Sequence, residues 1–288
     1  MSIFIRKLNK EDFSNVLTMQ TGIEDDYILP IFSELIIEPN VLYGLFLNRQ
    51  LVSFAGYTIF ANQYAMLGRL RSDLRYRGKG FATRLMSYVV EETQKVQDIK
   101  WIGANTQENN LTARRVLEKI GLHPYPKKYG AITQHVENLV TGSKPWTPIH
   151  DIQRKREWIN KVYVRNSEIF PYECYYLFPA TDQLFNDNQL NQWSFYENDH
   201  KTRFLITKQD QKGDLYLHTI YPWDDIDQQT GLWETIANDF KVLKQESDLN
   251  TCIWMDLSPE SVKKLPLKHT FELSSPWILY GKDKKDIS

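Results

Sequence analysis

Residues 75–80 read Arg-Tyr-Arg-Gly-Lys-Gly and bring two glycines and three cations together within six positions. Glycines one residue apart let the backbone turn sharply, and they leave successive N–H groups uncovered so that these can converge on an anion. An alternating apolar segment over residues 64–73 precedes the turn, and a helical pattern begins at Phe81. Because a helix start adds unpaired amides and the positive end of its dipole, the turn predicts a cradle for a pyrophosphate.

Two common phosphate-binding motifs do not fit the turn. A nucleotide-triphosphate loop needs a glycine five positions before the Gly-Lys pair and Ser or Thr after it, but Asp73 and Gly80 occupy these places. A dinucleotide fingerprint needs Gly or Ala three residues beyond Gly80, where Thr83 stands, and an acid after the next strand, residues 101–104, which has none. A plain strand-to-helix turn with a solvated basic rim is the remaining alternative for the turn by itself.

A second motif follows after one helix and one strand. It covers residues 110–122 and reads Asn-Leu-Thr-Ala-Arg-Arg-Val-Leu-Glu-Lys-Ile-Gly-Leu. Together the two motifs resemble the GCN5-related N-acetyltransferase (GNAT) family, whose acetyl-CoA pyrophosphate loop has Gln or Arg, two residues, Gly, one residue, and Gly or Ala. Two overlapping sets fit that pattern: Arg75, Gly78 and Gly80, and Arg77, Gly80 and Ala82.

The segments around both motifs have helical patterns that support the resemblance. Apolar residues over 81–93 fall on two adjacent rows spaced by four, which predicts one wide buried helix face. Asn110 is a good N-cap for the second helix, and Gly121 can close that helix in the left-handed conformation. In the resembled family the matching Asn also contacts the cofactor, and one residue can fill both roles.

The order of elements predicts an α/β fold with a mixed, mostly antiparallel GNAT-type sheet flanked by helices. In the first half we expect strands at 4–7, 41–46, 51–60, 64–72 and 100–104 and helices at 10–20, 30–37, 81–93 and from Asn110. Phe13, Val16 and Leu17 should share the buried face of the first helix.

The sequence pattern changes around Pro124, Pro126 and Pro148, so we expect one domain over 1–145 and another over 146–288. The second half repeats part of the first, with strands at 202–208, 214–221, 251–256 and 277–281 and helices at 152–162, 231–244 and 259–264. Its strand-to-helix turn carries Asp224, Asp225 and Asp227, which would repel a pyrophosphate. The second half therefore resembles a degenerate GNAT-like domain that does not bind CoA.

The resemblance implies an acyl-CoA N-acyltransferase that moves an acetyl group from acetyl-CoA to an amine by direct attack on the thioester carbonyl. Backbone amides near the end of the central strand would hold the pantetheine chain and polarise the thioester oxygen. The residues implied in cofactor binding are Leu70, Arg71, Ser72, Arg75, Arg77, Gly78, Lys79, Gly80, Phe81, Ala82, Asn110 and Ala113.

The groups that would move protons are less defined. Many family members carry Tyr seven residues after the capping Asn to protonate the departing thiolate, but this chain has Leu117 there. Tyr125 and Tyr129 could reach that space from a loop, or they could be partly buried loop aromatics. The base could be Asp73, Glu108 or His123, or a water chain could take the place of all three. Our catalytic candidates are Ser72, Asp73 and Tyr129.

The acceptor and the partners follow from charge. Residues 24–26, Glu-Asp-Asp, border the acceptor region in the resembled family and could favour a cationic amine, or they could be a solvated, helix-capping run. With 35 basic and 36 acidic side chains, the chain should bind neither nucleic acid nor membranes. No apolar run approaches the roughly 20 residues of a membrane helix, and no signal peptide is evident, so we expect a cytoplasmic protein.

The cysteines and histidines predict no metal site. Cys174 and Cys252 lie far apart in the sequence, and none of the six histidines belongs to a close pair with ligand spacing. Either thiol could be a nucleophile, but both stand among apolar or aromatic residues and are expected to be buried and inert.

Two functions remain. The first is an N-acetyltransferase that acts on an amine of a small molecule or peptide. The second is a non-enzymatic acyl-CoA-binding regulatory protein, favoured by the missing Tyr at position 117. Turnover of acetyl-CoA across a panel of amines distinguishes the two.

Overall fold

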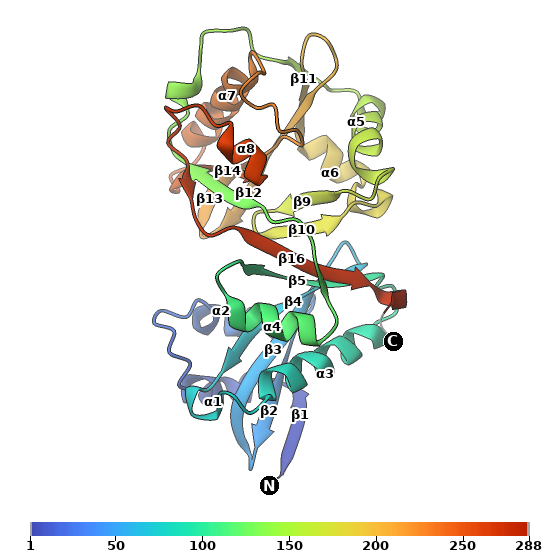
Figure 1. Ribbon diagram of the computed structural model, residues 1–288, viewed down its shortest axis with the longest axis vertical. Coiled ribbons are helices and arrows are strands. Elements are labelled where there is room, and N and C mark those ends of the chain that lie inside the picture. The colour runs from blue at the N-terminus through green and yellow to red at the C-terminus, as the bar shows by residue number, and fades with distance from the viewer. Residues whose placement is uncertain (1, 287–288) are drawn as a thin grey trace. The chain divides into compact units, whose positions relative to one another are not determined.

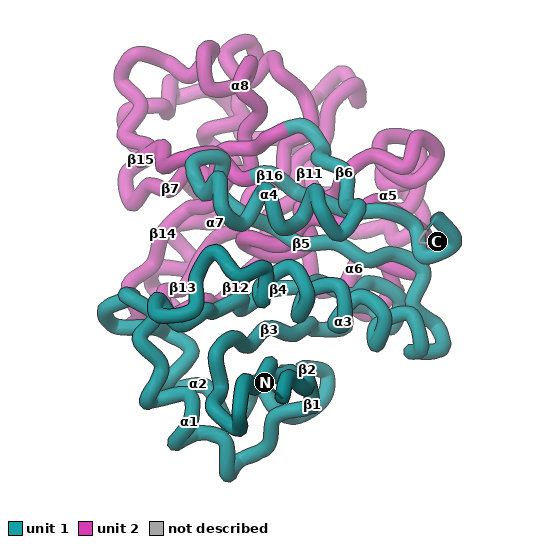
Figure 2. Tube along the Cα trace, turned by 60° about the horizontal axis from the view of Figure 1, so that its bottom comes forward, with its two compact units in different colours: residues 1–126, 278–288 teal, residues 127–277 magenta. Residues whose placement is uncertain are grey.

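The computed structural model describes residues 2–286 and divides the chain into two compact units. Unit 1 comprises residues 1–126 and 278–288, and unit 2 comprises residues 127–277 (Figure 2). Each unit contains one seven-stranded sheet, and helices pack against it (Figure 1). The expected mixed, mostly antiparallel α/β fold is therefore confirmed.

The sheet of unit 1 has the strand order β1-β2-β3-β4-β5-β16-β6. Strands β1 to β4 are antiparallel neighbours, whereas β4 and β5 run parallel and are joined through a helix. Its strands are β1 (Ile3–Lys7), β2 (Asn40–Leu47), β3 (Gln50–Phe60), β4 (Tyr64–Ser72), β5 (Trp101–Gln107), β6 (His123–Pro124) and β16 (Trp277–Asp283).

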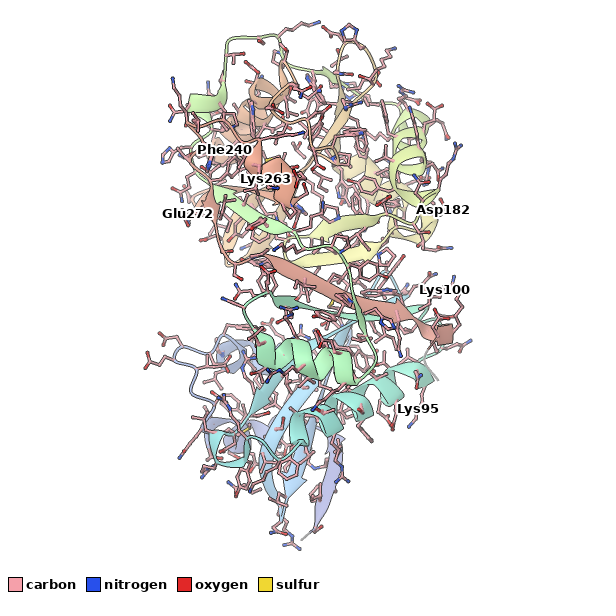
Figure 3. The ribbon with its side chains drawn as sticks, in the orientation of Figure 1. Lys95, Lys100, Asp182, Phe240, Lys263 and Glu272 are labelled. Carbon is pink, nitrogen blue, oxygen red and sulfur yellow. The ribbon has the colours of Figure 1, made fainter. Side chains whose placement is uncertain are left out.

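The helices of unit 1 cover both faces of this sheet. Residues alternate along β2, so that Tyr43 and Leu45 belong to the core under α3 and α4, whereas Leu42 and Phe46 belong to the core under α1 and α2. The bounds are α1 (Phe13–Leu17), α2 (Ile28–Leu35), α3 (Phe81–Lys95) and α4 (Leu111–Lys119), with short 3-10 turns at Lys10–Asp12, Leu74–Tyr76 and Lys284–Asp286. Lys95, the last residue of α3, is labelled in Figure 3.

The first helix is shorter than the expected 10–20. A capping box between Asn9 and Asp12 starts a 3-10 turn, and regular α-helix follows only over Phe13–Leu17. Because so short a helix presents a single row to the core, Val16 is buried but Phe13 and Leu17 remain 36% and 55% exposed.

Unit 2 has the strand order β15-β7-β14-β13-β12-β11-β8, and only β13 and β14 are parallel. Its sheet strands are β7 (Tyr129–Thr133), β8 (Thr147–Pro148), β11 (Ser194–Glu197), β12 (Phe204–Lys212), β13 (Asp214–Ile220), β14 (Thr251–Leu257) and β15 (Glu272–Leu273). A separate hairpin is made of β9 (Ile169–Glu173) and β10 (Tyr176–Pro179). The helices of unit 2 are α5 (Ile152–Ile159), α6 (Asp187–Gln192), α7 (Leu232–Gln245) and α8 (Pro259–Lys263). A π turn over Asn160–Val164 follows α5, and 3-10 turns cover Glu137–Leu139 and Asp182–Leu184.

Helix α7 covers one face of this second sheet. Its buried side chains, including Ile236 and Phe240, pack against Leu217 of β13 and Ile253 of β14 (Figure 3). The opposite face of β13 and β14 carries Tyr216 and Trp254, which contact Cys174 at the turn of the β9–β10 hairpin.

The compact units differ from the expected division at residue 145, because two strands are exchanged between the halves of the chain. Strand β16 was expected to complete the second half, but it lies between β5 and β6 of unit 1. Conversely, β7 lies between β14 and β15 of unit 2. The sixth place in each sheet is therefore filled by a strand from the opposite half of the chain.

Close packing fixes β16 in unit 1. Tyr280 is completely buried, and a Cβ added to Gly103 of β5 would lie 2.4 Å from the Tyr280 carbonyl oxygen. The amide of Tyr125 donates a hydrogen bond of 2.8 Å to the carbonyl of Leu279. Within residues 2–286, no helix has the length and apolar character required to cross a membrane.

Candidate functional site

The parallel strands β4 and β5 separate halfway along their length. Residues 64–67 pair with residues 101–104, and the pairing then stops, although β4 continues to Ser72 and β5 to Gln107. Among residues 2–286, the edge of β4 over residues 68–72 therefore has no neighbouring strand on its β5 side. Such an edge presents backbone donors and acceptors that can hold an extended ligand.

A bulge in β4 causes this separation. The register with β3 shifts between Phe54 and Gly56, and Arg69 adopts the left-handed conformation with φ of 58°. This conformation is costly for a residue with a Cβ. The Arg69 guanidinium compensates by donating to the Thr58 hydroxyl at 2.7 Å and to the Asn40 side-chain oxygen at 3.2 Å.

The cradle was expected at residues 75–80, and in the structure the turn at the start of α3 leaves the amides of residues 78–83 free. Gly78 and Gly80 have φ values of 77° and 76°, and a Cβ added to either would meet no atom within 4 Å. No hydrogen bond among residues 2–286 uses the amides of residues 78–83. The cradle therefore presents consecutive unpaired N–H donors at the positive end of a 15-residue helix.

The cations around the cradle are not equivalent. The Arg75 side chain forms an ion pair with Asp73, with Nη2 2.6 Å from Oδ2, so that its charge is offset. Arg77 donates to the Thr21 carbonyl at 3.2 Å, and the ammonium of Lys79 lies over the Tyr76 ring. Sequence reasoning missed Arg84, an exposed residue whose amide donates a hydrogen bond to the Gly80 carbonyl. Its position one turn into the predicted helix could have indicated a further cation beside the cradle.

The geometry does not support the prediction that Asp73 is a general base. Its side chain is completely buried and accepts hydrogen bonds from the Arg75 guanidinium and from the amides of Arg75 and Gln20. These bonds, led by that from the Arg75 side chain, lower the pKa of Asp73 to about 2 despite its burial. A carboxylate this acidic and enclosed is a weak proton acceptor, and its role here is to cap the turn before the cradle.

The two other catalytic candidates lie in different units. The Ser72 hydroxyl is at the end of β4, 3.0 Å from the Ser53 hydroxyl. Tyr129 belongs to β7 of unit 2, not to a loop, and its side chain packs against the core of that unit. Unit 1 therefore places Ser72 at the end of β4 that leads to the cradle, whereas Tyr129 is not part of this unit.

The predicted second motif forms the start of α4. The Asn110 side chain caps the helix by accepting a hydrogen bond of 3.1 Å from the amide of Ala113. That amide is therefore already paired, and cofactor contacts of Asn110 and Ala113 remain predictions. Leu117 is buried in the core, which removes any polar group from the position where the resembled family has Tyr.

The acidic run at residues 24–26 is partly neutralised. Asp26 accepts two hydrogen bonds from the Arg71 guanidinium, at 2.7 and 2.8 Å, and one from the amide of Ile28. Only Glu24 and Asp25 are exposed. The Asp26–Arg71 pair therefore joins the segment before α2 to the free edge of β4.

Unit 1 is thus a mixed α/β domain with a split parallel strand pair and an anion cradle at the start of the helix that joins the pair. Residues 4–122 match the sequence model of the acetyltransferase (GNAT) family. The resemblance of the two motifs is therefore confirmed. No curated protein matches the chain in sequence.

Solved structures extend the fold comparison to both units. A GCN5-related N-acetyltransferase from Sphaerobacter thermophilus has a TM-score of 0.57 and 12% identity, over 98% of this chain and 96% of that chain. A protein classed as an acetyltransferase from Thermoplasma acidophilum has a TM-score of 0.57 and 12% identity, over 97% and 99% of the two chains. At these identities the likeness establishes the fold alone.

Proposed function

We propose that the chain is an N-acetyltransferase that binds acetyl-CoA in unit 1 and transfers its acetyl group to an amine of a small molecule or peptide. The observation that carries this proposal is the cradle at residues 78–83, whose amides have no acceptor within the described chain. It starts directly after the strand edge freed by the bulge at Arg69. The match of residues 4–122 to the GNAT family model supports the same assignment.

The residues present fit such a ligand. The space over Gly78 and Gly80, which a side chain would fill, allows a pyrophosphate to approach the backbone closely. Lys79 and Arg84 are exposed and, within the described residues, have no carboxylate partner, so their charges are available to the phosphates. The free edge of β4 over residues 68–72 would hold the pantetheine chain by backbone hydrogen bonds. Acetyl-CoA supplies the acetyl group as an activated thioester.

The amine must lose a proton to become a nucleophile, because an alkyl ammonium has a pKa of roughly 10. Asp73 is held as an ion pair, so it does not perform this task. Leu117 is apolar and buried, so the departing CoA thiolate takes its proton from solvent. We assign proton removal to solvent water at the open edge of β4. The acceptor is positioned by the segment before α2, which carries the exposed Tyr27 over the Arg71 guanidinium.

A calorimetric titration with CoA tests the cradle directly. Wild-type protein should bind one CoA per chain, and Gly80→Val should weaken binding by roughly 30-fold or more because the β-branched side chain blocks close approach to the amides. Gly213→Val is the matched control, since Gly213 also has a left-handed φ, 87°, and open space around it, but lies in unit 2. Equal losses in both variants, or none in Gly80→Val, would contradict the proposal.

The alternative function is a non-enzymatic acyl-CoA-binding regulatory protein. Two observations favour it: Leu117 replaces the usual proton donor, and Asp73 is unsuitable as a base. Both functions require CoA binding, so the discriminating measurement is consumption of acetyl-CoA across a panel of small amines and peptide N-termini. Tight binding without turnover on any amine would favour the regulatory protein.

A further inference from the structure

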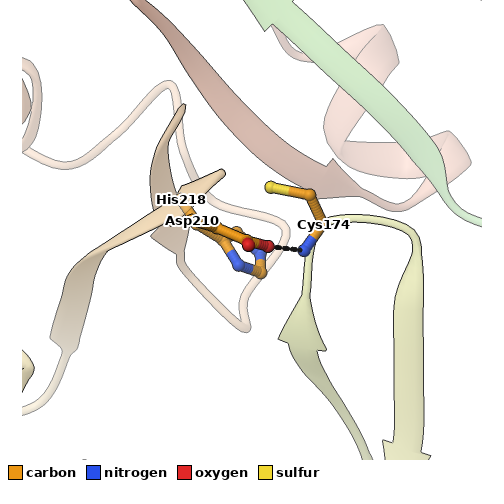
Figure 4. Close-up of side chains that lie close together, drawn as sticks. All are labelled: Cys174, Asp210 and His218. Atoms are coloured by element: carbon orange, nitrogen blue, oxygen red, sulfur yellow. Dashed lines mark hydrogen bonds between the residues drawn. The ribbon is translucent and has the colours of Figure 1, made fainter. Parts of the chain in front are cut away.

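Three potential metal ligands meet in unit 2, on the face of the sheet opposite α7 (Figure 4). They are Cys174 at the turn of the β9–β10 hairpin, Asp210 on β12 and His218 on β13. The Cys174 sulfur, a carboxylate oxygen of Asp210 and a ring nitrogen of His218 all lie within 4.8 Å of one another. None of these residues belongs to the CoA cradle of unit 1.

His218 has the tautomer and environment of a metal ligand. Its side chain is completely buried, and Nε2 lies 2.9 Å from Oδ2 of Asp256, an oxygen that also accepts the Trp254 indole N–H at 3.0 Å. The proton therefore belongs on Nε2, and Nδ1 carries a lone pair. Within residues 2–286, this buried Nδ1 has no hydrogen-bond partner. A carboxylate that holds the second nitrogen is the usual outer shell of a metal-bound histidine.

The hairpin that carries Cys174 is fixed against β12. The amide of Cys174 donates a hydrogen bond of 2.6 Å to Asp210, and Lys208 donates from its ammonium to the Tyr172 carbonyl. Lys212 forms an ion pair with Glu173 at 2.7 Å. These contacts place the thiol next to Asp210 and His218 before any ligand arrives.

The hairpin turn is also strained next to the thiol. Tyr175 has a φ of 71°, an unfavourable conformation for a residue with a Cβ, and its ring packs on Trp254 with centroids 4.4 Å apart. Backbone strain of this kind persists where surrounding contacts enforce it, and it is concentrated at functional sites.

We propose that Cys174, Asp210 and His218 bind a divalent transition metal, with Zn²⁺ the ion that best suits a set of one sulfur, one nitrogen and one oxygen ligand. Two ligands on one tetrahedral zinc lie about 3.3 to 3.7 Å apart, so the widest pair would move inward by roughly 1 Å. Three protein ligands leave the fourth position to water.

The charges around the cluster accommodate a dication. Burial, with the nearby Asp210 and Asp256 carboxylates, raises the pKa of the Cys174 thiol, so without a metal the thiol keeps its proton. Binding exchanges this proton for the metal, forming the sulfur–metal bond and releasing H⁺ to solvent. Burial also lowers the pKa of His218, which keeps the imidazole neutral and its Nδ1 lone pair available. Asp210, 9% exposed, borders solvent and provides an entry path.

Titration of the full-length protein with Co²⁺ and with Zn²⁺ tests this proposal. We expect one metal per chain, a thiolate-to-Co²⁺ charge-transfer absorption in the near ultraviolet, and displacement of Co²⁺ by Zn²⁺. Cys174→Ser should abolish the charge-transfer band, and His218→Gln should abolish or strongly weaken metal binding. Cys252→Ser, the matched control, removes the other buried thiol of unit 2 and should leave the spectrum unchanged.

The wild-type spectrum alone decides the proposal if a variant fails to fold. Co²⁺ binding without the charge-transfer band, or no binding at all, would overturn it. A band that survives in Cys174→Ser and disappears in Cys252→Ser would also overturn it. Melting temperature with and without Zn²⁺ gives an independent readout, because a metal that binds only the native state raises it.

Discussion

The helices α3 and α7 begin in the same way but have opposite surroundings. Each follows a strand that pairs in parallel with the next strand, and each has a left-handed glycine at its N-cap, Gly80 with φ of 76° and Gly231 with φ of 82°. A Cβ at Gly80 would meet nothing within 4 Å, whereas a Cβ at Gly231 would lie 2.2 Å from the Lys144 carbonyl oxygen. The first helix start is open, and the second is closed by its own chain.

The closure in unit 2 uses the amides of an approaching loop. Glu234 in the first turn of α7 accepts hydrogen bonds from the amides of Thr141 and Ser143, at 2.8 and 3.0 Å, and from the Thr141 hydroxyl. The amide of Trp146 donates to the Thr235 hydroxyl at 2.8 Å. An intramolecular segment thus occupies the position that a phosphate would need.

The two sheets also differ in whether the strand before the helix has a free edge. Strands β12 and β13 pair without a bulge, and β13 pairs with β14 over residues 215–219, so no free strand edge comparable to that of β4 results. Two of the three acids of the second turn bind within unit 2, because Asp224 accepts hydrogen bonds from Ser258 and Ser261 and Asp225 binds Arg203. The comparison teaches that a glycine at a helix start does not make an anion site unless the amides and the adjoining strand edge are left free.

The strongest test converts the open helix start into the closed kind. Thr83 is the third residue of α3, as Glu234 is the third residue of α7. Thr83→Glu should weaken CoA binding by roughly 30- to 1,000-fold, since a carboxylate near the phosphates costs about 2 to 4 kcal/mol. Thr83→Gln, of the same size but neutral, should lose far less in a parallel calorimetric titration. Similar affinities for both variants would mean that the phosphates bind elsewhere.

The reciprocal change opens the closed helix start. Glu234→Ala removes the carboxylate that accepts from the partly buried amides of Thr141 and Ser143, and we expect a fall of about 1.5 to 3 kcal/mol in the free energy of unfolding. Glu234→Gln keeps an acceptor oxygen and should lose less. Urea denaturation measures both, and CoA affinity of unit 1 should not change. A loss under about 0.5 kcal/mol in the alanine variant would show that the loop is held by other contacts.

The bulge in β4 gives a smaller, more specific test. Arg69→Gly relieves the left-handed strain that Arg69→Ala retains, so we expect the glycine variant to be about 1 kcal/mol more stable than the alanine variant. At Lys7, an exposed residue in the regular strand β1, the order should reverse, because glycine in a strand costs about 0.5 to 1 kcal/mol relative to alanine. The same order at both sites would mean that the strain at Arg69 is not significant.

The smallest effects concern single exposed cations. Lys79→Ala and Arg84→Ala should each weaken CoA binding by about 2- to 5-fold, in a salt-dependent manner, because exposed charge pairs contribute about 0.2 to 1 kcal/mol. Lys95, at the opposite end of α3 and paired with Glu92, is the control and should have no effect. If Lys95→Ala weakened CoA binding equally, the losses at Lys79 and Arg84 would reflect a general effect of net charge and not contacts with the phosphates.

Local patterns predicted the elements around the cradle well. Helix α3 begins at Phe81 as expected, and Asn110 and Gly121 cap α4, with Gly121 at φ of 76°. These features depend on neighbouring residues: a helical period, a capping side chain and a glycine that tolerates positive φ. The cradle could therefore be located from the sequence.

The contacts that define what the site can do are long-range and could not be predicted. Nothing in the residues near Arg69 indicates a left-handed arginine, since its partners Thr58 and Asn40 come from two other strands. The burial of Asp73 depends on the Gln20 amide, 53 residues away. The approach of Cys174 to His218 likewise requires the hairpin to fold onto the sheet, and sequence spacing gives no sign of it.

The exchange of β7 and β16 affects when the sheet of unit 1 can be completed during synthesis. A ribosome releases residues 1–126 well before residues 278–283, so the sixth place in the sheet of unit 1 stays empty until all of unit 2 has been synthesised. During that interval the adjoining edges of β5 and β6 are unpaired, and exposed strand edges recruit other chains. Strand β16 therefore couples completion of this sheet to synthesis of the whole of unit 2.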